Sequence, residues 1–180
     1  MPRLKAGLSA GEYATLGLLR KRPMHGYDIA RRFTAELDLG LVLPLDMSTV
    51  YALLKDLQEQ GLLEGRRETI GLRPPCTVYA LSADAEAQFL HWLQEPVSRL
   101  RGVRLDLLVK LHFCRSIGSR CSAQLLDAQL DESRAYLNRL TRLTAEAPPE
   151  SFEHLVRVSN LTAAQATRTW LETERRQLAG

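Results

Sequence analysis

The 180-residue chain lacks the features that mark membrane proteins and the commonest enzyme families. No apolar run approaches the ~20 residues of a membrane-spanning helix, and Lys5 and Glu12 interrupt the N-terminal stretch where a signal segment would lie. The sequence also has no phosphate-binding glycine loop, dinucleotide fingerprint or Gly-x-Ser-x-Gly nucleophile motif. We therefore expect a soluble, cytoplasmic protein with no membrane partner and no enzymatic activity.

Cysteine is scarce, with only Cys76, Cys114 and Cys121, and the four histidines are scattered. An odd number of cysteines cannot all pair within one chain, and none of the spacings matches a metal-binding pattern. We therefore expect free thiols in a reducing cytoplasm, and neither a metal nor another cofactor. A redox role for Cys76, which lies in an expected hairpin, stays open.

An excess of charge of one sign is also missing, since 24 Lys and Arg residues oppose 21 Asp and Glu residues and leave a net charge of +3. Residues 1–94 carry 11 basic and 11 acidic side chains, so net charge gives no support for nucleic-acid binding in that half. Such binding would require basic side chains to gather on one face. The candidates are Arg31, Arg32, Lys55, Arg66, Arg67 and Arg73.

Residues 16–81 have the element order of a winged helix-turn-helix, which is three short helices followed by two strands. Ser9 and Glu12 form a capping-box pattern at the start of the first helix, and Pro23 ends that helix. The second helix should begin near Gly26, because a residue without Cβ permits the close backbone approach of a tight helix-turn-helix.

The third helix has the clearest pattern, beginning after Asp46 as N-cap and ending at Gly61. Its apolar stripe consists of Val50, Leu53, Leu54 and Leu57. The opposite side carries the hydroxyl and amine groups of Ser48, Thr49, Tyr51 and Lys55. Such groups can reach phosphates or base edges, which predicts a DNA-recognition helix; an ordinary solvated face is the alternative.

A hairpin follows the third helix. Residues 62–68 and 77–81 have strand-like patterns, and residues 71–75, with two prolines, form the turn. Arg66, Arg67 and Arg73 gather around it. We interpret this hairpin as a wing that lies along a phosphate backbone, with an exposed solubilising loop as the alternative.

The second half of the chain reads as helical, which predicts a mainly α protein with a small β-wing. Helices are expected over 83–94 and 105–113, after Gly118 to about residue 146, and from about 151 to 178. The two long helices carry an apolar seam that resembles a coiled coil. We assign dimerisation to Leu126, Leu130, Leu137, Leu140 and Trp170.

These assignments predict two domains, a winged helix-turn-helix over 1–94 and a helical dimerisation or effector domain over 95–180. A symmetric dimer would place two recognition helices on the half-sites of a pseudo-palindrome, about one helical turn (~34 Å) apart. A helical bundle within a monomer is the alternative. Aromatic residues could line an apolar effector pocket or simply form the core: Phe89, Trp92, Phe113 and Trp170.

The sequence resembles the PadR family of bacterial transcriptional regulators. The resemblance rests on residues 16–19, 23–29, 50–51, 57, 61–63 and 78–81, above all on Pro23-Met24-His25-Gly26-Tyr27 ahead of a tyrosine-bearing third helix. Residues 104–111 and 166–171 resemble the family's virulence-activator-type C-terminal domain.

This resemblance implies a homodimeric, cytoplasmic regulator of double-stranded DNA, usually a repressor, in which Tyr51 and its neighbours approach the DNA. A small hydrophobic molecule would act as effector. The chain departs from the family pattern at Ser48-Thr49, at Ala52 and at Pro75-Cys76-Thr77, so base preference and wing contacts should differ. A sensing or protein-binding dimer whose winged helix no longer binds DNA is the alternative function.

Overall fold

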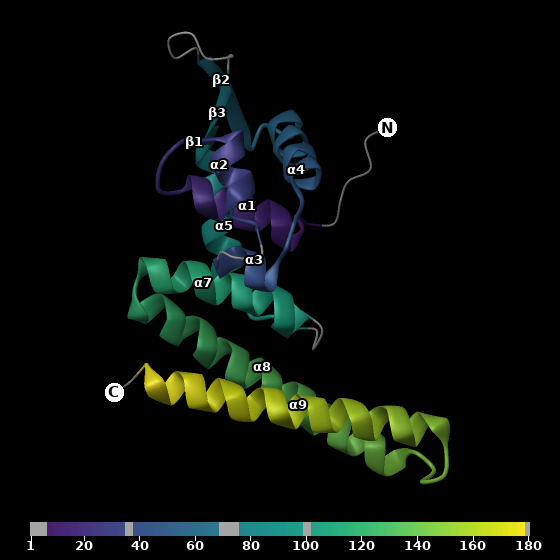
Figure 1. Ribbon diagram of the computed structural model, residues 1–180. Coiled ribbons are helices and arrows are strands. Elements are labelled where there is room, and N and C mark those ends of the chain that lie inside the picture. The colour runs from purple at the N-terminus through teal and green to yellow at the C-terminus, as the bar shows by residue number, and fades with distance from the viewer. Residues whose placement is uncertain (1–6, 35–37, 69–75, 99–101, 179–180) are drawn as a thin grey trace. The chain divides into compact units, whose positions relative to one another are not determined.

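The computed structural model describes residues 7–34, 38–68, 76–98 and 102–178 (Figure 1). The described chain is mostly helical with one small three-stranded antiparallel sheet, which confirms the expected fold class. Two compact units make up the chain, one of residues 1–93 with 104–113 and one of residues 94–103 with 114–180. The predicted domain boundary after residue 94 stays a prediction.

The first unit contains α1 (Ala10–Leu19), α2 (Gly26–Arg31), α3 (Asp38–Val42), α4 (Met47–Glu59) and α5 (Ala83–Gln94). The capping box at Ser9 and Glu12 is present as expected, and Asp46 caps α4. The second helix begins at Gly26, as expected, and ends at Arg31. The short α3 was not expected.

The sheet has the order β1-β3-β2 and includes β1 (Met24–His25), β2 (Leu63–Glu68) and β3 (Cys76–Leu81). The hairpin of β2 and β3 follows the predicted pattern, and Gly65 lies opposite Tyr79. The two-residue β1 was not expected; it pairs Met24 with Tyr79 on the other side of β3. This third strand ties the start of α2 to the base of the hairpin.

The core of the first unit lies under α4, α2 and α1. Three members of the predicted stripe of α4 are fully buried, Val50, Leu54 and Leu57, while Leu53 is partly exposed. Phe113 of α7 (Leu108–Ile117) presses onto α1, where a Cβ on Gly17 would lie 2.6 Å from its ring. The chain enters α7 through one turn of π-helix, η1 (Val103–Leu107).

The second unit is built on a hairpin of two long helices, α8 (Ser119–Glu146) and α9 (Phe152–Gln177), which lie side by side (Figure 1). Both match the expected ranges closely. Leu137 and Leu140 of α8 pack with Ala164 of α9. Near the other end of the hairpin, Arg175 donates from Nε and Nη2 to Asp127 at 2.7 and 3.1 Å.

Candidate nucleic-acid interface

The exposed face of α4 collects four of the predicted DNA-binding side chains. Ser48, Thr49, Tyr51 and Lys55 are all exposed, whereas Val50 between them is fully buried. The structure therefore brings these four side chains together on one surface, as the spacing predicted. A helix that presents hydroxyls and an amine while its other side is anchored in a core is suited to contact phosphates and base edges.

Asp46 fixes the beginning of this helix. One oxygen of its carboxylate accepts hydrogen bonds from the backbone N–H of Thr49 and from the hydroxyl of Ser48, both at 2.7 Å. The backbone bond from Thr49 and then the side-chain bond from Ser48 lower the pKa of Asp46 below its ordinary value of 3.8. Ser48 is thus engaged in the cap, and its hydroxyl reaches DNA only by sharing or leaving that bond.

Tyr51 lies directly over the backbone of Gly26, the first residue of α2. A Cβ on Gly26 would come within 2.9 Å of Cε1 of Tyr51 and 3.3 Å of Cε2 of Tyr79. Only glycine leaves this space for the ring, which confirms the close approach expected at Gly26. Burial, and then the neighbouring Tyr51, raise the pKa of Tyr79 above 10.0. The phenol of Tyr51 itself stays 43% exposed.

Lys55 lies one turn after Tyr51 and is well exposed. Its Nζ is 3.8 Å from Oε1 of Glu59. Because both side chains are mostly in solvent, this ion pair holds Lys55 only weakly. The amine can therefore exchange Glu59 for a phosphate at little cost.

Arg66 and Arg67 of the wing do not share one face. Arg66 and Arg67 are both exposed on β2, but consecutive residues of a strand point to opposite sides of the sheet. A Cβ on Gly65 would lie 2.9 Å from the side chain of Gln58 in α4. Arg67 is on the same side of β2 as Gly65, so Arg67 is the one on the α4 side. Arg73 lies outside the described residues.

The structure adds two exposed side chains that sequence reasoning gave no role. Tyr27, the second residue of α2, is 54% exposed next to Gly26, and Met47 begins α4 with 44% of its surface exposed. Tyr27 stands within the Pro23–Ile29 motif, but the motif alone does not say which side chain points outward. Arg31 and Arg32 are also exposed, at the end of α2.

The predicted dimerisation residues lie inside the α8–α9 hairpin to different degrees. Leu126, Leu137 and Leu140 are buried within the single chain, and Leu130 and Trp170 are partly buried. The exposed apolar side chains of the hairpin are found instead in the first two turns of α9. These are Phe152, Leu155, Val156 and Val158.

The described residues hold no group of three or more His, Cys, Asp or Glu side chains placed to bind a metal ion. Among the described helices, none is long and apolar enough to cross a membrane. Three of the four aromatic residues considered for an effector pocket pack against other rings: Phe89 meets Phe113 edge-on at 5.4 Å, and Trp92 stacks on Tyr13 at 4.3 Å. Lys110 covers the Trp92 ring, 4.7 Å from its centroid.

Two known protein families match the sequence. The transcriptional regulator PadR-like family matches residues 15–89, and the virulence activator alpha C-term family matches residues 103–179. The negative transcriptional regulator PadR of Bacillus subtilis is 29% identical over 174 residues, which is 90% of this chain and 93% of that protein.

Solved structures of the Bacillus subtilis protein are also similar. Its complex with operator DNA is 26% identical, with a TM-score of 0.47 over 93% of this chain and 98% of that chain. Its complex with p-coumaric acid is 26% identical, with a TM-score of 0.44 over 96% of this chain and 100% of that chain. The relatives are regulators rather than enzymes, and with both family models matched in order along its length, the chain belongs to the PadR-like family of transcriptional regulators.

Proposed function

We propose that the protein is a cytoplasmic, homodimeric repressor that binds a pseudo-palindromic operator through α4 and is released by a small hydrophobic ligand. The observation that carries the proposal is the exposed face of α4. Ser48, Thr49, Tyr51 and Lys55 are all exposed on a helix whose opposite side carries the fully buried Val50, Leu54 and Leu57. The Bacillus subtilis relative is a negative regulator, which favours repression.

In this proposal the residues of the face have different tasks. Tyr51, held over Gly26, reads base edges together with Thr49. Lys55 and the wing arginines, Arg67 above all, contact phosphates and supply affinity that does not depend on sequence. This division accommodates the neutral charge of residues 1–94, because only a local group of cations is needed.

Dimerisation is proposed through the second unit. Of the predicted residues, Leu137 and Leu140 pack with Ala164 of α9 within one chain, whereas Leu130 and Trp170 are partly exposed and remain candidates for contact with a second subunit. The apolar side chains at the start of α9 are exposed, Phe152 and Leu155 most of all, and apolar patches of this kind mark association surfaces. A twofold arrangement is the commonest way to cover such a surface.

The next part of the proposal is the place where the ligand binds. A small cavity of about 20 Å³, which is room for about one water molecule, lies among the described residues of the second unit. Its lining includes Val97, Gln129, Tyr136 and Leu171. An aromatic effector would need this cavity to enlarge, or a site completed by the second subunit. We would test p-coumaric acid, the ligand in the structure of the Bacillus subtilis relative, by quenching of tryptophan fluorescence.

The deciding experiment is selection of genomic DNA fragments on the purified protein, read by sequencing, with the molar mass measured by light scattering. An inverted repeat enriched by a dimer supports the proposal. A dimer that retains no fragment at low salt would instead favour a sensing or protein-binding module whose winged helix no longer binds DNA.

Lys55 offers a sharper test of the interface once an operator is known. We expect Lys55→Ala to weaken binding to every duplex and to reduce the slope of log K against log salt by ~0.9, the value for one lost phosphate contact. Arg142→Ala, which removes one positive charge from an exposed position of α8, is the matched control and should leave the slope unchanged. Equal slopes for the parent and Lys55→Ala would remove Lys55 from the interface.

A further inference from the structure

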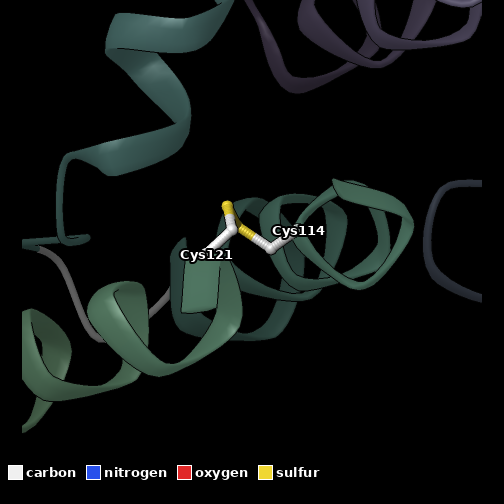
Figure 2. The surroundings of a disulfide bond; sticks show 2 residues. All are labelled: Cys114 and Cys121. Carbon is white, nitrogen blue, oxygen red and sulfur yellow. A yellow bond between two sulfur atoms is a disulfide. The ribbon is translucent and has the colours of Figure 1, made fainter. Parts of the chain in front are cut away.

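Two of the three cysteines meet where α7 turns into α8. Cys114 and Cys121 are joined by a disulfide with a Cα–Cα separation of 5.1 Å, within the range usual for such bonds (Figure 2). The expectation of three free thiols is therefore wrong for this pair. Their separation of seven residues resembles no common motif, and only the turn between the helices brings them together.

The two sulfur atoms differ in access. Cys114 is fully buried near the end of α7, whereas Cys121 is partly exposed in the first turn of α8. Cys121 is therefore the more accessible residue of the pair. The exposed member also lies at the positive end of the α8 dipole, an environment that favours a thiolate over a thiol.

The ring closed by the disulfide contains the corner between the helices. Gly118, with φ of +146°, forms this corner, and its N–H donates to the carbonyl of Cys114 at 2.9 Å. Glycine adopts many backbone conformations, so the disulfide adds a covalent restraint to a corner that is otherwise held by backbone hydrogen bonds alone. Phe113, the residue before Cys114, is the one that packs against Gly17 in the first unit. The cross-link therefore acts on the segment that leads from the first unit into α8.

We propose that Cys114 and Cys121 form a reversible redox site for peroxides, and that its oxidation state regulates DNA binding by fixing or freeing the α7–α8 corner. The thiolate of Cys121 attacks one oxygen of the peroxide, the O–O bond breaks, and a sulfenic acid and one hydroxide or water form. Cys114 then attacks that sulfur, the S–O bond breaks, and water leaves as the disulfide forms. Two thiols are oxidised and one peroxide is reduced to two waters. A dithiol such as dithiothreitol reverses the change by thiol–disulfide exchange at Cys121.

The regulatory part of this inference rests on the proposed DNA-binding function, whereas the redox site does not. The full-length protein would be studied in a Cys76→Ser background, because Cys76 is the remaining free cysteine and is partly exposed in β3. Samples treated with hydrogen peroxide or dithiothreitol would be unfolded in denaturant, so that the buried Cys114 becomes accessible, and then alkylated and mapped by mass spectrometry. Their operator affinity and the hydrogen exchange of the amides between residues 114 and 121 would be measured in parallel.

We expect peroxide to protect both thiols from alkylation, dithiothreitol to restore them, and the operator Kd of the two forms to differ at least about fivefold, the lower range of allosteric coupling. Exchange at the corner should be faster in the reduced form. Cys121→Ser, which leaves the buried Cys114 in place, should bind DNA equally well in both conditions. Cys114→Ser, provided that it folds, should likewise bind DNA equally well after peroxide and after dithiothreitol.

Different failures separate the two proposals. Thiols that both remain alkylatable after peroxide overturn the redox site. A disulfide that forms without changing the operator Kd overturns its regulatory role, and so does an equal peroxide response in Cys121→Ser. Binding to no duplex in either redox state overturns the proposed DNA-binding function, while the alkylation map still decides whether the redox site exists.

Discussion

Replacing Gly26 with alanine tests whether the backbone beneath Tyr51 holds its ring in position for DNA. The added Cβ would lie 2.9 Å from Cε1 of Tyr51, 3.3 Å from Cε2 of Tyr79 and 3.5 Å from Cδ1 of Leu54. Carbon atoms prefer separations of ~3.5–4.0 Å, so the first two contacts cannot persist. Tyr51 is 43% exposed, and its ring is the one free to move outward.

The free energy of unfolding should change little, because two effects oppose each other. Overpacking costs ~1–3 kcal/mol where neighbours cannot yield, but the Tyr51 ring can yield into solvent. Alanine is also favoured over glycine within a helix by ~0.5–1 kcal/mol, and the φ of Gly26 is not positive, so the new residue suffers no backbone strain. We expect a net loss of about 1 kcal/mol or less.

Operator affinity should fall much more. A displaced Tyr51 would lose its proposed base contact, and one such contact contributes ~1–3 kcal/mol, which corresponds to a rise in Kd of about 5- to 150-fold. Fluorescence anisotropy with an operator fragment and with random DNA measures this loss, and thermal unfolding checks the stability. The loss should be larger on the operator than on random DNA.

A double-mutant cycle isolates the mechanism. If Gly26 acts only through the ring, the double variant Gly26→Ala, Tyr51→Ala should bind no more weakly than Tyr51→Ala alone. Gly11→Ala is the matched control, because its Cβ would meet the methyl carbons of Leu53 and Leu45 at 3.1 and 3.4 Å. It should leave the operator affinity unchanged. Additive losses in the double variant, or a Gly26→Ala protein with parental affinity, would refute this account of Tyr51.

Three further changes test the packing behind the interface. Gly17→Ala should destabilise the protein by ~1–3 kcal/mol in urea unfolding, because the buried Phe113 ring, 2.6 Å from the new Cβ, has no solvent to move into. Gln129→Leu should cost ~1–3 kcal/mol, since its buried amide donates to the carbonyl of Val97 at 2.9 Å and accepts from its N–H at 2.7 Å. Because folding lowers the pKa of Asp46, its carboxylate stabilises the folded protein at pH values above the ordinary pKa of 3.8. This contribution is lost as the pH falls through the folded-state pKa. Asp46→Ala should therefore remove part of the loss of Tm on acidification, and an unchanged acid dependence would contradict the role of this cap.

The sequence predicted the exposed face of α4 well because every signal there is local. Asp46 as N-cap, the stripe of Val50, Leu54 and Leu57 and the stop at Gly61 are read from spacings of three and four, and these same spacings determine which side of α4 remains exposed. The wing was predicted only in part. A cluster of arginines in the sequence suggests one basic surface, but the alternation of a strand sends Arg66 and Arg67 to opposite sides.

Pairings between distant residues were beyond the reach of sequence patterns. The strand β1 exists because Met24 and His25 find partners in β3, more than fifty positions away, and two residues alone have no periodicity to detect. The disulfide was missed for a similar reason. Cys114 and Cys121 belong to different helices, and counting cysteines says nothing about a turn that brings two of them together.

The long helices show most clearly what periodicity leaves open. An apolar seam indicates that a helix face is covered, but it does not say whether a partner helix of the same chain or of a second subunit covers it. In α8 the regular seam is occupied by α9, and Leu137 and Leu140 are already buried within one chain. The side chains left for a second subunit, Phe152 and Leu155 among them, lie at the start of α9 and are exposed. If the dimer forms there, Leu155→Asp should lower the molar mass measured by light scattering to that of a monomer while leaving the helical circular dichroism signal intact. Leu137→Asp should instead unfold the hairpin itself, so the two substitutions distinguish a surface between subunits from a seam within one.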